Sequence, residues 1–178
     1  MRDLQIKSRI KAKLKPALLL IFISALTTPA EAVFAPLFIV ERTTNGNVVH
    51  YDAQIGANGQ LDPREPVVVY WTIGSEKGSR QDLNFLERKR AWGLEVMRKS
   101  EGRYVISVVS QRQIQIEVYQ REGKVHAETA IAGSRAYLRK IFVNIEGPLL
   151  FPKVNYIDLF GSDVMSGEDR YERLTPSK

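Results

Sequence analysis

Apolar and polar residues alternate with a period of two along most of the chain beyond residue 33. Within residues 47–55, for example, Val49 and Tyr51 alternate with His50 and Asp52. This alternation is typical of strands that have one buried and one solvated face. It favours a mainly β architecture, because an amphipathic helix would need apolar residues at spacings of three and four.

Turn-forming residues, mostly Gly, Pro, Asn and Ser, separate the alternating segments from one another. The predicted strands cover residues 37–42, 47–55, 66–73, 94–97, 104–109, 114–119, 125–131, 136–145, 154–160 and, more weakly, 170–174. They follow one another at roughly eight to twelve residues, so we expect an antiparallel meander of about eight to ten strands that forms a barrel or a sandwich. The short connections slightly favour a barrel, whose interior would be filled by side chains or hold one small ligand.

One stretch breaks the alternation and predicts a short helix over about residues 80–91. Ser79 and Asp82 resemble a capping box, in which a hydroxyl is followed three residues later by an acid. Leu83 and Leu86 then follow at helical spacing, and Gly93 ends the segment. We expect this helix to lie at one end of the barrel.

The first 32 residues have the three parts of a secretory signal peptide. A basic segment precedes the apolar residues 17–26, and the leader ends in Ala30-Glu31-Ala32. A membrane anchor is the alternative, but this apolar stretch makes only about 15 Å of helix, half of a hydrocarbon core. We therefore expect cleavage after Ala32 and export of residues 33–178 as a single domain without a membrane span. The periplasm of a Gram-negative bacterium is the default destination, and secretion from the cell is the alternative.

The basic charge of the chain lies mostly in this leader. The formal net charge is +6, and the leader holds six Lys/Arg and two acidic residues, which leaves +2 for residues 33–178. A nearly neutral domain argues against nucleic acid as a partner, and the basic residues 88–90 are typical of a solvated helix face. The absence of cysteine excludes a disulfide, a thiolate nucleophile and a cysteine zinc site.

Three residues are candidates for catalysis. His50 and Asp52 share one face of a predicted strand, about 7 Å apart, where a histidine beside a carboxylate can act as a general base or bind a metal. Asp158 shares a strand face with aromatic residues, so it must be paired, solvated or shifted in pKa. Its expected ion-pair partners are Arg42, Arg139 and Lys153.

Other chemistry finds little support in the sequence. It contains no nucleophile elbow, phosphate loop or dinucleotide fingerprint, so we expect no cofactor and no metal site. Aromatic side chains on strands either pack in the core or line a cavity. The candidate ligand contacts are Tyr51, Trp71, Tyr156 and Lys153.

Several spaced motifs resemble one family. They are residues 36–42, 45–53, 61–66, 70–71, 83–84, 152–161, 167–168 and 170–173. Together they are similar to the secreted bacterial family catalogued as domain of unknown function 4833, over nearly all of residues 33–178. The resemblance implies a bacterial exported single domain, and it assigns no catalytic residue.

Three functions remain open. The first is a non-catalytic domain that binds a small or lipid-like molecule inside the barrel or between the sheets. The second is an envelope protein that binds a protein partner through a strand edge or an aromatic patch. The third is an enzyme that uses His50 with Asp52, Glu65 or Asp158, provided that folding brings two of these groups together in a cleft.

Overall fold

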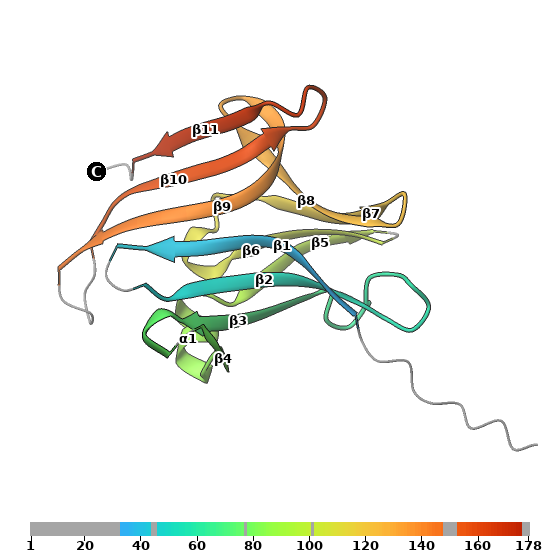
Figure 1. Cartoon of the computed structure of the whole chain (residues 1–178). Helices are drawn as coiled ribbons and strands as arrows, with labels where there is room; N and C mark the ends of the chain where they lie inside the picture. Colours follow the sequence, from blue (N-terminus) through green and yellow to red (C-terminus); the bar gives the residue numbers. More distant parts are fainter. Residues whose placement is uncertain (1–32, 44–45, 77, 101, 148–152, 176–178) are drawn as a thin grey trace, which may run out of the picture.

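The computed structural model describes residues 33–43, 46–76, 78–100, 102–147 and 153–175, so the predicted leader, residues 1–32, lies outside the described residues. The described residues form one eleven-stranded sheet that curls into a half-barrel (Figure 1). The strands are β1 (Val33–Arg42), β2 (Val48–Ile55), β3 (Val67–Ile73), β4 (Ser79–Asp82), β5 (Leu94–Ser100), β6 (Arg103–Val108), β7 (Ile116–Arg121), β8 (Lys124–Ile131), β9 (Ser134–Glu146), β10 (Lys153–Asp163) and β11 (Asp169–Leu174). The prediction of a mainly β fold with one short helix is confirmed.

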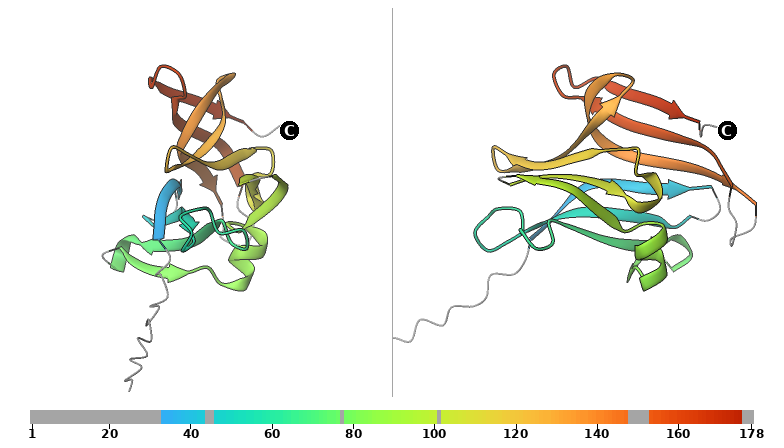
Figure 2. Two further views of the ribbon diagram at one scale, coloured as in Figure 1. Left: turned by 90° about the vertical axis from the view of Figure 1, so that its right-hand side faces the viewer. Right: turned by 180° about the vertical axis from the view of Figure 1, so that it is seen from behind.

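The strand order is β4-β3-β2-β1-β9-β8-β7-β6-β5, and β10 and β11 extend the sheet from the other edge of β9. Consecutive strands pair antiparallel as a meander, except for β4 and β5, which lie at the two ends of this order. The one parallel pair among the described strands joins β1 to β9. β10 pairs with β9 over nearly its whole length, so β8 and β1 share the opposite edge. β8 pairs with the beginning of β9 and β1 with residues 140–143, which lets the sheet curl (Figure 2).

The concave face of the sheet carries the core, and we call it the inner face. Alternate residues of β1, β2, β6, β7 and β9 are almost fully buried there. Phe38 and Tyr51 stack with their ring centroids 4.4 Å apart. The Tyr51 hydroxyl donates a hydrogen bond of 2.7 Å to the backbone carbonyl oxygen of Trp92, which ties β2 to the segment after the helix. We call the opposite side of the sheet the outer face.

The helix α1 (Phe85–Arg90) is shorter than the expected helix over residues 80–91. Its N-cap is Asn84, whose side chain accepts from the Glu87 backbone while Glu87 accepts from the Asn84 backbone. The predicted cap at Ser79 is wrong, because β4 begins at this residue and pairs with β3. α1 has no buried residue of its own, but Leu83 and Trp92 on either side of it are buried and hold it against the end of the sheet.

The described residues contain no helix that is both long and apolar enough to cross a membrane.

Candidate functional site: an apolar pocket beside the helix

A pocket of about 530 Å³ opens between α1 and one end of the half-barrel. Its apolar lining comes from β3, α1, β9 and β10 and from the segment that follows α1, and we call it the tryptophan pocket. The apolar side chains that line it are Trp71, Leu86, Ala91, Trp92, Val143, Ile145 and Val154. Small-molecule sites in proteins are typically concave, mostly apolar and about 300–1,000 Å³ in volume, so this pocket has the dimensions of a ligand site.

Two indole rings form a corner of the pocket. Trp71 lies on the inner face of β3, and Trp92 follows α1, so residues far apart in the sequence supply the two rings. Their centroids are 5.7 Å apart and their planes meet at 78°, which is an edge-to-face contact. The hydrogen bond from Tyr51 to the Trp92 carbonyl fixes the backbone that carries the second ring. This rigid aromatic corner forms part of the apolar wall of the pocket.

Arg42 lies over both rings. It is the last residue of β1, and it faces inward because it continues the alternation of the buried Phe38 and Val40. The guanidinium carbon is 5.3 Å from the Trp71 ring centroid and 5.8 Å from that of Trp92. Both distances are within the range of a cation–π contact. Partial burial lowers the pKa of Arg42, and the negative charge of nearby Glu87 only partly opposes this shift. The side chain keeps its positive charge, because the guanidinium group is not deprotonated in proteins.

The other polar residues of the lining come from α1 and from the 3-10 helix η2 (Val109–Gln111). Glu87 and Arg90 lie on α1, and Ser110 and Gln111 lie on η2. Gln111 is only 4% exposed, and its side-chain oxygen accepts a hydrogen bond of 3.0 Å from the amide of Gln113. A smaller cavity of about 230 Å³ continues the site toward β4 and shares Arg42, Trp71 and Glu87 with it.

The structure divides the predicted ligand contacts among different places. Trp71 lines the tryptophan pocket, whereas Tyr51 lies behind it in the core, where burial raises the pKa of its hydroxyl. Tyr156 lies on the outer face against the guanidinium of Arg173, 3.8 Å from its ring centroid. Lys153 is exposed at the beginning of β10, one residue before the lining residue Val154.

Three residues of the pocket lining, Trp92, Arg42 and Gln111, were not among the predicted ligand contacts. The available signal was that the chain has two tryptophans, one before and one after the predicted helix.

His50 and Asp52 lie on the outer face of β2, and each has its own partner. The His50 Nε2 is 2.8 Å from the Thr72 hydroxyl, and its ring stacks on Tyr70 at 5.0 Å. The Tyr70 hydroxyl donates a 2.8 Å hydrogen bond to Asp52. In the described structure, no hydrogen bond joins His50 to Asp52, so the two side chains do not form a catalytic pair there.

Asp158 is a buried carboxylate on the outer face of β10, and its partner is Arg173. None of the three expected partners is correct, because Asp158 pairs directly with Arg173 in the register of β10 and β11. The two guanidinium contacts are 2.7 and 2.8 Å long, and the Tyr171 hydroxyl donates a third hydrogen bond of 3.0 Å. The hydrogen bonds from Arg173 hold the pKa of Asp158 below its ordinary value.

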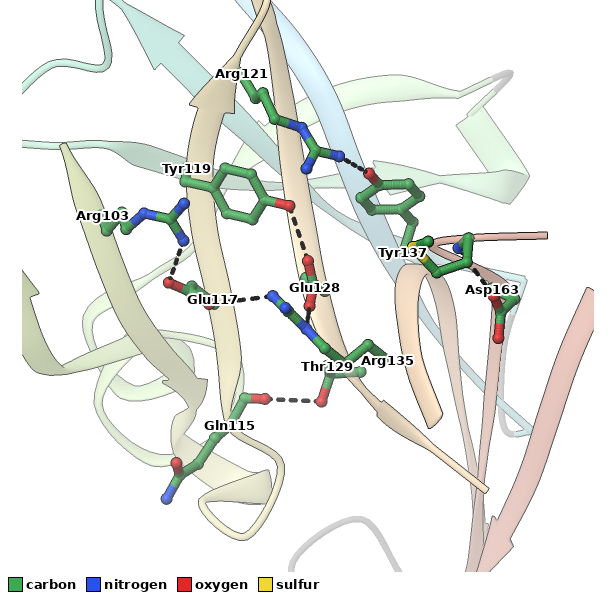
Figure 3. Close-up of polar contacts among 11 residues, drawn as sticks. Arg103, Gln115, Glu117, Tyr119, Arg121, Glu128, Thr129, Arg135, Tyr137 and Asp163 are labelled. Carbon is green, nitrogen blue, oxygen red and sulfur yellow. Dashed lines mark hydrogen bonds and ion pairs between the residues drawn. The ribbon is translucent and has the colours of Figure 1, made fainter. Parts of the chain in front are cut away.

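A larger network of polar side chains ties β6, β7, β8 and β9 together on the outer face (Figure 3). The buried Glu128 accepts from the Tyr119 hydroxyl at 2.8 Å and from the guanidinium of Arg135. Burial and the neighbouring Glu128 raise the pKa of the Tyr119 hydroxyl. Beside it, Arg103 donates to Glu117 at 2.8 Å. Each of these groups is paired with another side chain, so the network holds the strands in register.

The family model for domain of unknown function 4833, DUF4833, matches residues 38–173. The chain belongs to the DUF4833 family. The comparison with curated proteins and the comparison with solved structures each gave no match.

The region matched by the DUF4833 model contains the whole tryptophan pocket, from Arg42 on β1 to Val154 on β10. The pocket is therefore built within the family domain. A metal site finds no support in the part of the chain that the structure describes, since it holds no group of three or more His, Cys, Asp or Glu side chains placed to bind one ion.

Proposed function

We propose that this protein is a non-catalytic binding domain that takes a small, largely apolar molecule into the tryptophan pocket. The observation that carries the proposal is the pocket itself: two indoles and five aliphatic side chains line a concavity of about 530 Å³ beside α1. Binding an apolar molecule there would remove apolar surface of the molecule and of the pocket from water, which stabilises the complex by about 25 cal/mol per Å² of apolar surface buried.

We also propose that the domain works outside the cytoplasm. The support is the leader described above, with its basic start, its short apolar stretch and its Ala-x-Ala end. The mass of the protein recovered from the envelope of its host would test this. Export predicts a chain that begins at Val33, and an intact chain that stays in the cytoplasm would overturn it.

Intrinsic fluorescence gives a direct test of the pocket, because both tryptophans of the chain line it. A titration with the neutral apolar fluorophore N-phenylnaphthylamine should quench the tryptophan emission saturably and enhance the emission of the probe. The absence of a saturable change in either signal would overturn the proposal.

Two substitutions on α1 make a matched pair for this titration. Leu86 lines the pocket and is 58% exposed, whereas its neighbour Phe85 is 73% exposed and is not part of the lining. Leu86→Gln should weaken binding of the probe several-fold, and Phe85→Gln should leave it near the wild-type value. Equal effects of the two variants would show that the probe binds elsewhere.

The second candidate function is the binding of an envelope protein at the edge strand β5. β5 ends the strand order and pairs only with β6 among the described strands, and Val96 on it is 55% exposed. An unpaired strand edge can accept an extended segment of a partner. A partner retained from an envelope extract by the wild-type protein and lost with Val96→Lys would support this function. Equal retention by both would refute it.

The third hypothesis, an enzyme built on His50, gains no support from the geometry. Thr72 and Tyr70 contact His50, Tyr70 contacts Asp52, and Arg173 contacts Asp158. Catalysis by His50 would need one of the carboxylates within hydrogen-bond reach of the imidazole or of a shared water. We therefore do not propose a reaction.

A further inference from the structure

We propose that the molecule bound in the tryptophan pocket carries one carboxylate, which Arg42 and Gln111 bind while its apolar chain lies against the indoles and Val143. The inference rests on the proposed function and adds the charge of the ligand to it. The ligand class is thus a single-chain carboxylic acid in its ionised form.

The charges in the lining favour an anion. The lining contains two basic side chains, Arg42 and Arg90, and one acidic side chain, Glu87, so it carries a net positive charge. Glu87 also has a structural task, since one of its oxygens accepts the Asn84 backbone N–H at 2.9 Å. Another carboxylate, Asp82, borders the smaller cavity on the side of β4 but does not line the main pocket.

The hydrogen-bonding groups in the lining also suit a carboxylate. The side-chain oxygen of Gln111 accepts from Gln113, which leaves its amide N–H groups as donors. Gln111 is nearly fully buried, and among the described residues no hydrogen bond engages this amide nitrogen. Because Gln111 lines the pocket, this amide can donate to an acceptor on a ligand there. A guanidinium and an amide both donate, and an ionised carboxylate only accepts.

The position of Arg42 over the aromatic corner disfavours a positively charged ligand. Two indoles at nearly a right angle would ordinarily attract a ligand cation, but the guanidinium of Arg42 already lies over both rings. A cationic ligand would meet this charge at short range in a partly desolvated site, which is a repulsive contact. The same guanidinium attracts a carboxylate, and a charge-assisted hydrogen bond to it is roughly twice as strong as a neutral one.

Three probes with the same alkyl chain test the charge: dodecanoate, dodecanol and dodecylamine, each titrated at neutral pH as a competitor of N-phenylnaphthylamine. We expect dodecanoate to bind about tenfold or more tightly than dodecanol, and dodecylamine to bind most weakly. The affinity for dodecanoate should fall with rising salt concentration more steeply than that for dodecanol, because salt screens the charge interaction alone. The full chain without its leader, residues 33–178, is used for all titrations.

Two variants test the residues. Arg42→Gln should remove most of the preference for dodecanoate over dodecanol, because only the acid loses a charge-assisted hydrogen bond. Gln111→Met keeps the volume of the side chain and removes its donors, so it should lower the affinity for dodecanoate more than the affinity for dodecanol. The Gln111 variant keeps the test decisive if the loss of Arg42 impairs folding.

The outcomes separate the two proposals. Equal affinities for the acid and the alcohol in the wild type would overturn the charge inference and leave the binding function standing. A preference for the acid that survives both substitutions would refute the roles of Arg42 and Gln111. Failure of N-phenylnaphthylamine and of all three alkyl probes to bind would refute the proposed function itself.

Discussion

Replacing Tyr51 by phenylalanine removes one buried oxygen atom and nothing else from the centre of the fold. The hydroxyl is fully buried and donates to the Trp92 carbonyl at 2.7 Å. A buried hydrogen bond contributes about 1 kcal/mol net, and a buried group left without its partner costs about 1–3 kcal/mol. We therefore expect Tyr51→Phe to lower the free energy of unfolding by about 2 kcal/mol, toward the middle of this range.

Urea denaturation followed by tryptophan emission measures this change directly. A loss of about 2 kcal/mol lowers the folded-to-unfolded ratio about 30-fold and should move the midpoint without changing the slope of the transition. In thermal unfolding it corresponds to a shift of roughly 4–8 °C for a domain of this size. Trp92 stands in the pocket, so the folded variant should also show an altered tryptophan emission maximum.

The matched control is Tyr156→Phe on the outer face. Within the described part of the chain, the Tyr156 ring contacts Arg173 and its hydroxyl makes no hydrogen bond. This substitution should leave the free energy of unfolding within about 0.5 kcal/mol of the wild-type value. The reasoning is refuted if the two variants unfold at the same urea concentration, because the bond to Trp92 would then make no net contribution.

Two further predictions concern the outer face and the sheet. The pKa of Asp158 is lower in the folded protein than in the unfolded chain, mainly because of its hydrogen bonds with Arg173. The ion pair therefore stabilises the fold above about pH 4, and this stabilisation is lost as the pH falls through the folded-state pKa. Asp158→Asn should unfold at a lower urea concentration than the wild type at pH 7, and the difference between the two should shrink in acid. In Gly161→Ala the new methyl carbon would lie 2.5 Å from the Tyr137 carbonyl oxygen, whereas a methyl carbon added at Gly46 would have no atom within 4 Å. Calorimetry should show a clear loss of melting temperature for Gly161→Ala and little loss for Gly46→Ala. The reverse order would contradict the close packing at Gly161.

The sequence predicted the strands well where their alternation reports burial. All ten predicted segments overlap observed strands, because residues with buried neighbours on one face must alternate. β4 escaped detection since all four of its residues are exposed and polar, and only pairing with β3 makes it a strand. Three of these residues fell within the predicted helix, so its predicted start is more than one turn too early.

Pairing between side chains was less predictable than burial. An ion pair was one of the three states expected for Asp158, because a buried carboxylate is costly without a partner. The choice of Arg173 depends on the register of β10 with β11 and on a bulge in the pairing of β10 with β9 between Val154 and Tyr156. Neither feature leaves a periodic signal in the sequence, and a shift of one residue would turn a side chain to the other face.

The tryptophan pocket depends on a feature of the fold that the meander pattern did not predict, the parallel pairing of β1 with β9. This pairing sets Arg42 opposite Val143, so the cation of the lining and its aliphatic wall lie at the same level of the half-barrel. The Thr43 hydroxyl then donates to the Ile145 carbonyl at 2.8 Å and accepts from the Ile145 N–H at 2.9 Å. These two bonds hold the end of β1 beside the wall of the pocket. An antiparallel partner of β9 at this edge would run in the opposite direction and would not bring Arg42 to Val143, so the placement of Arg42 over the indoles follows from the direction of a single strand.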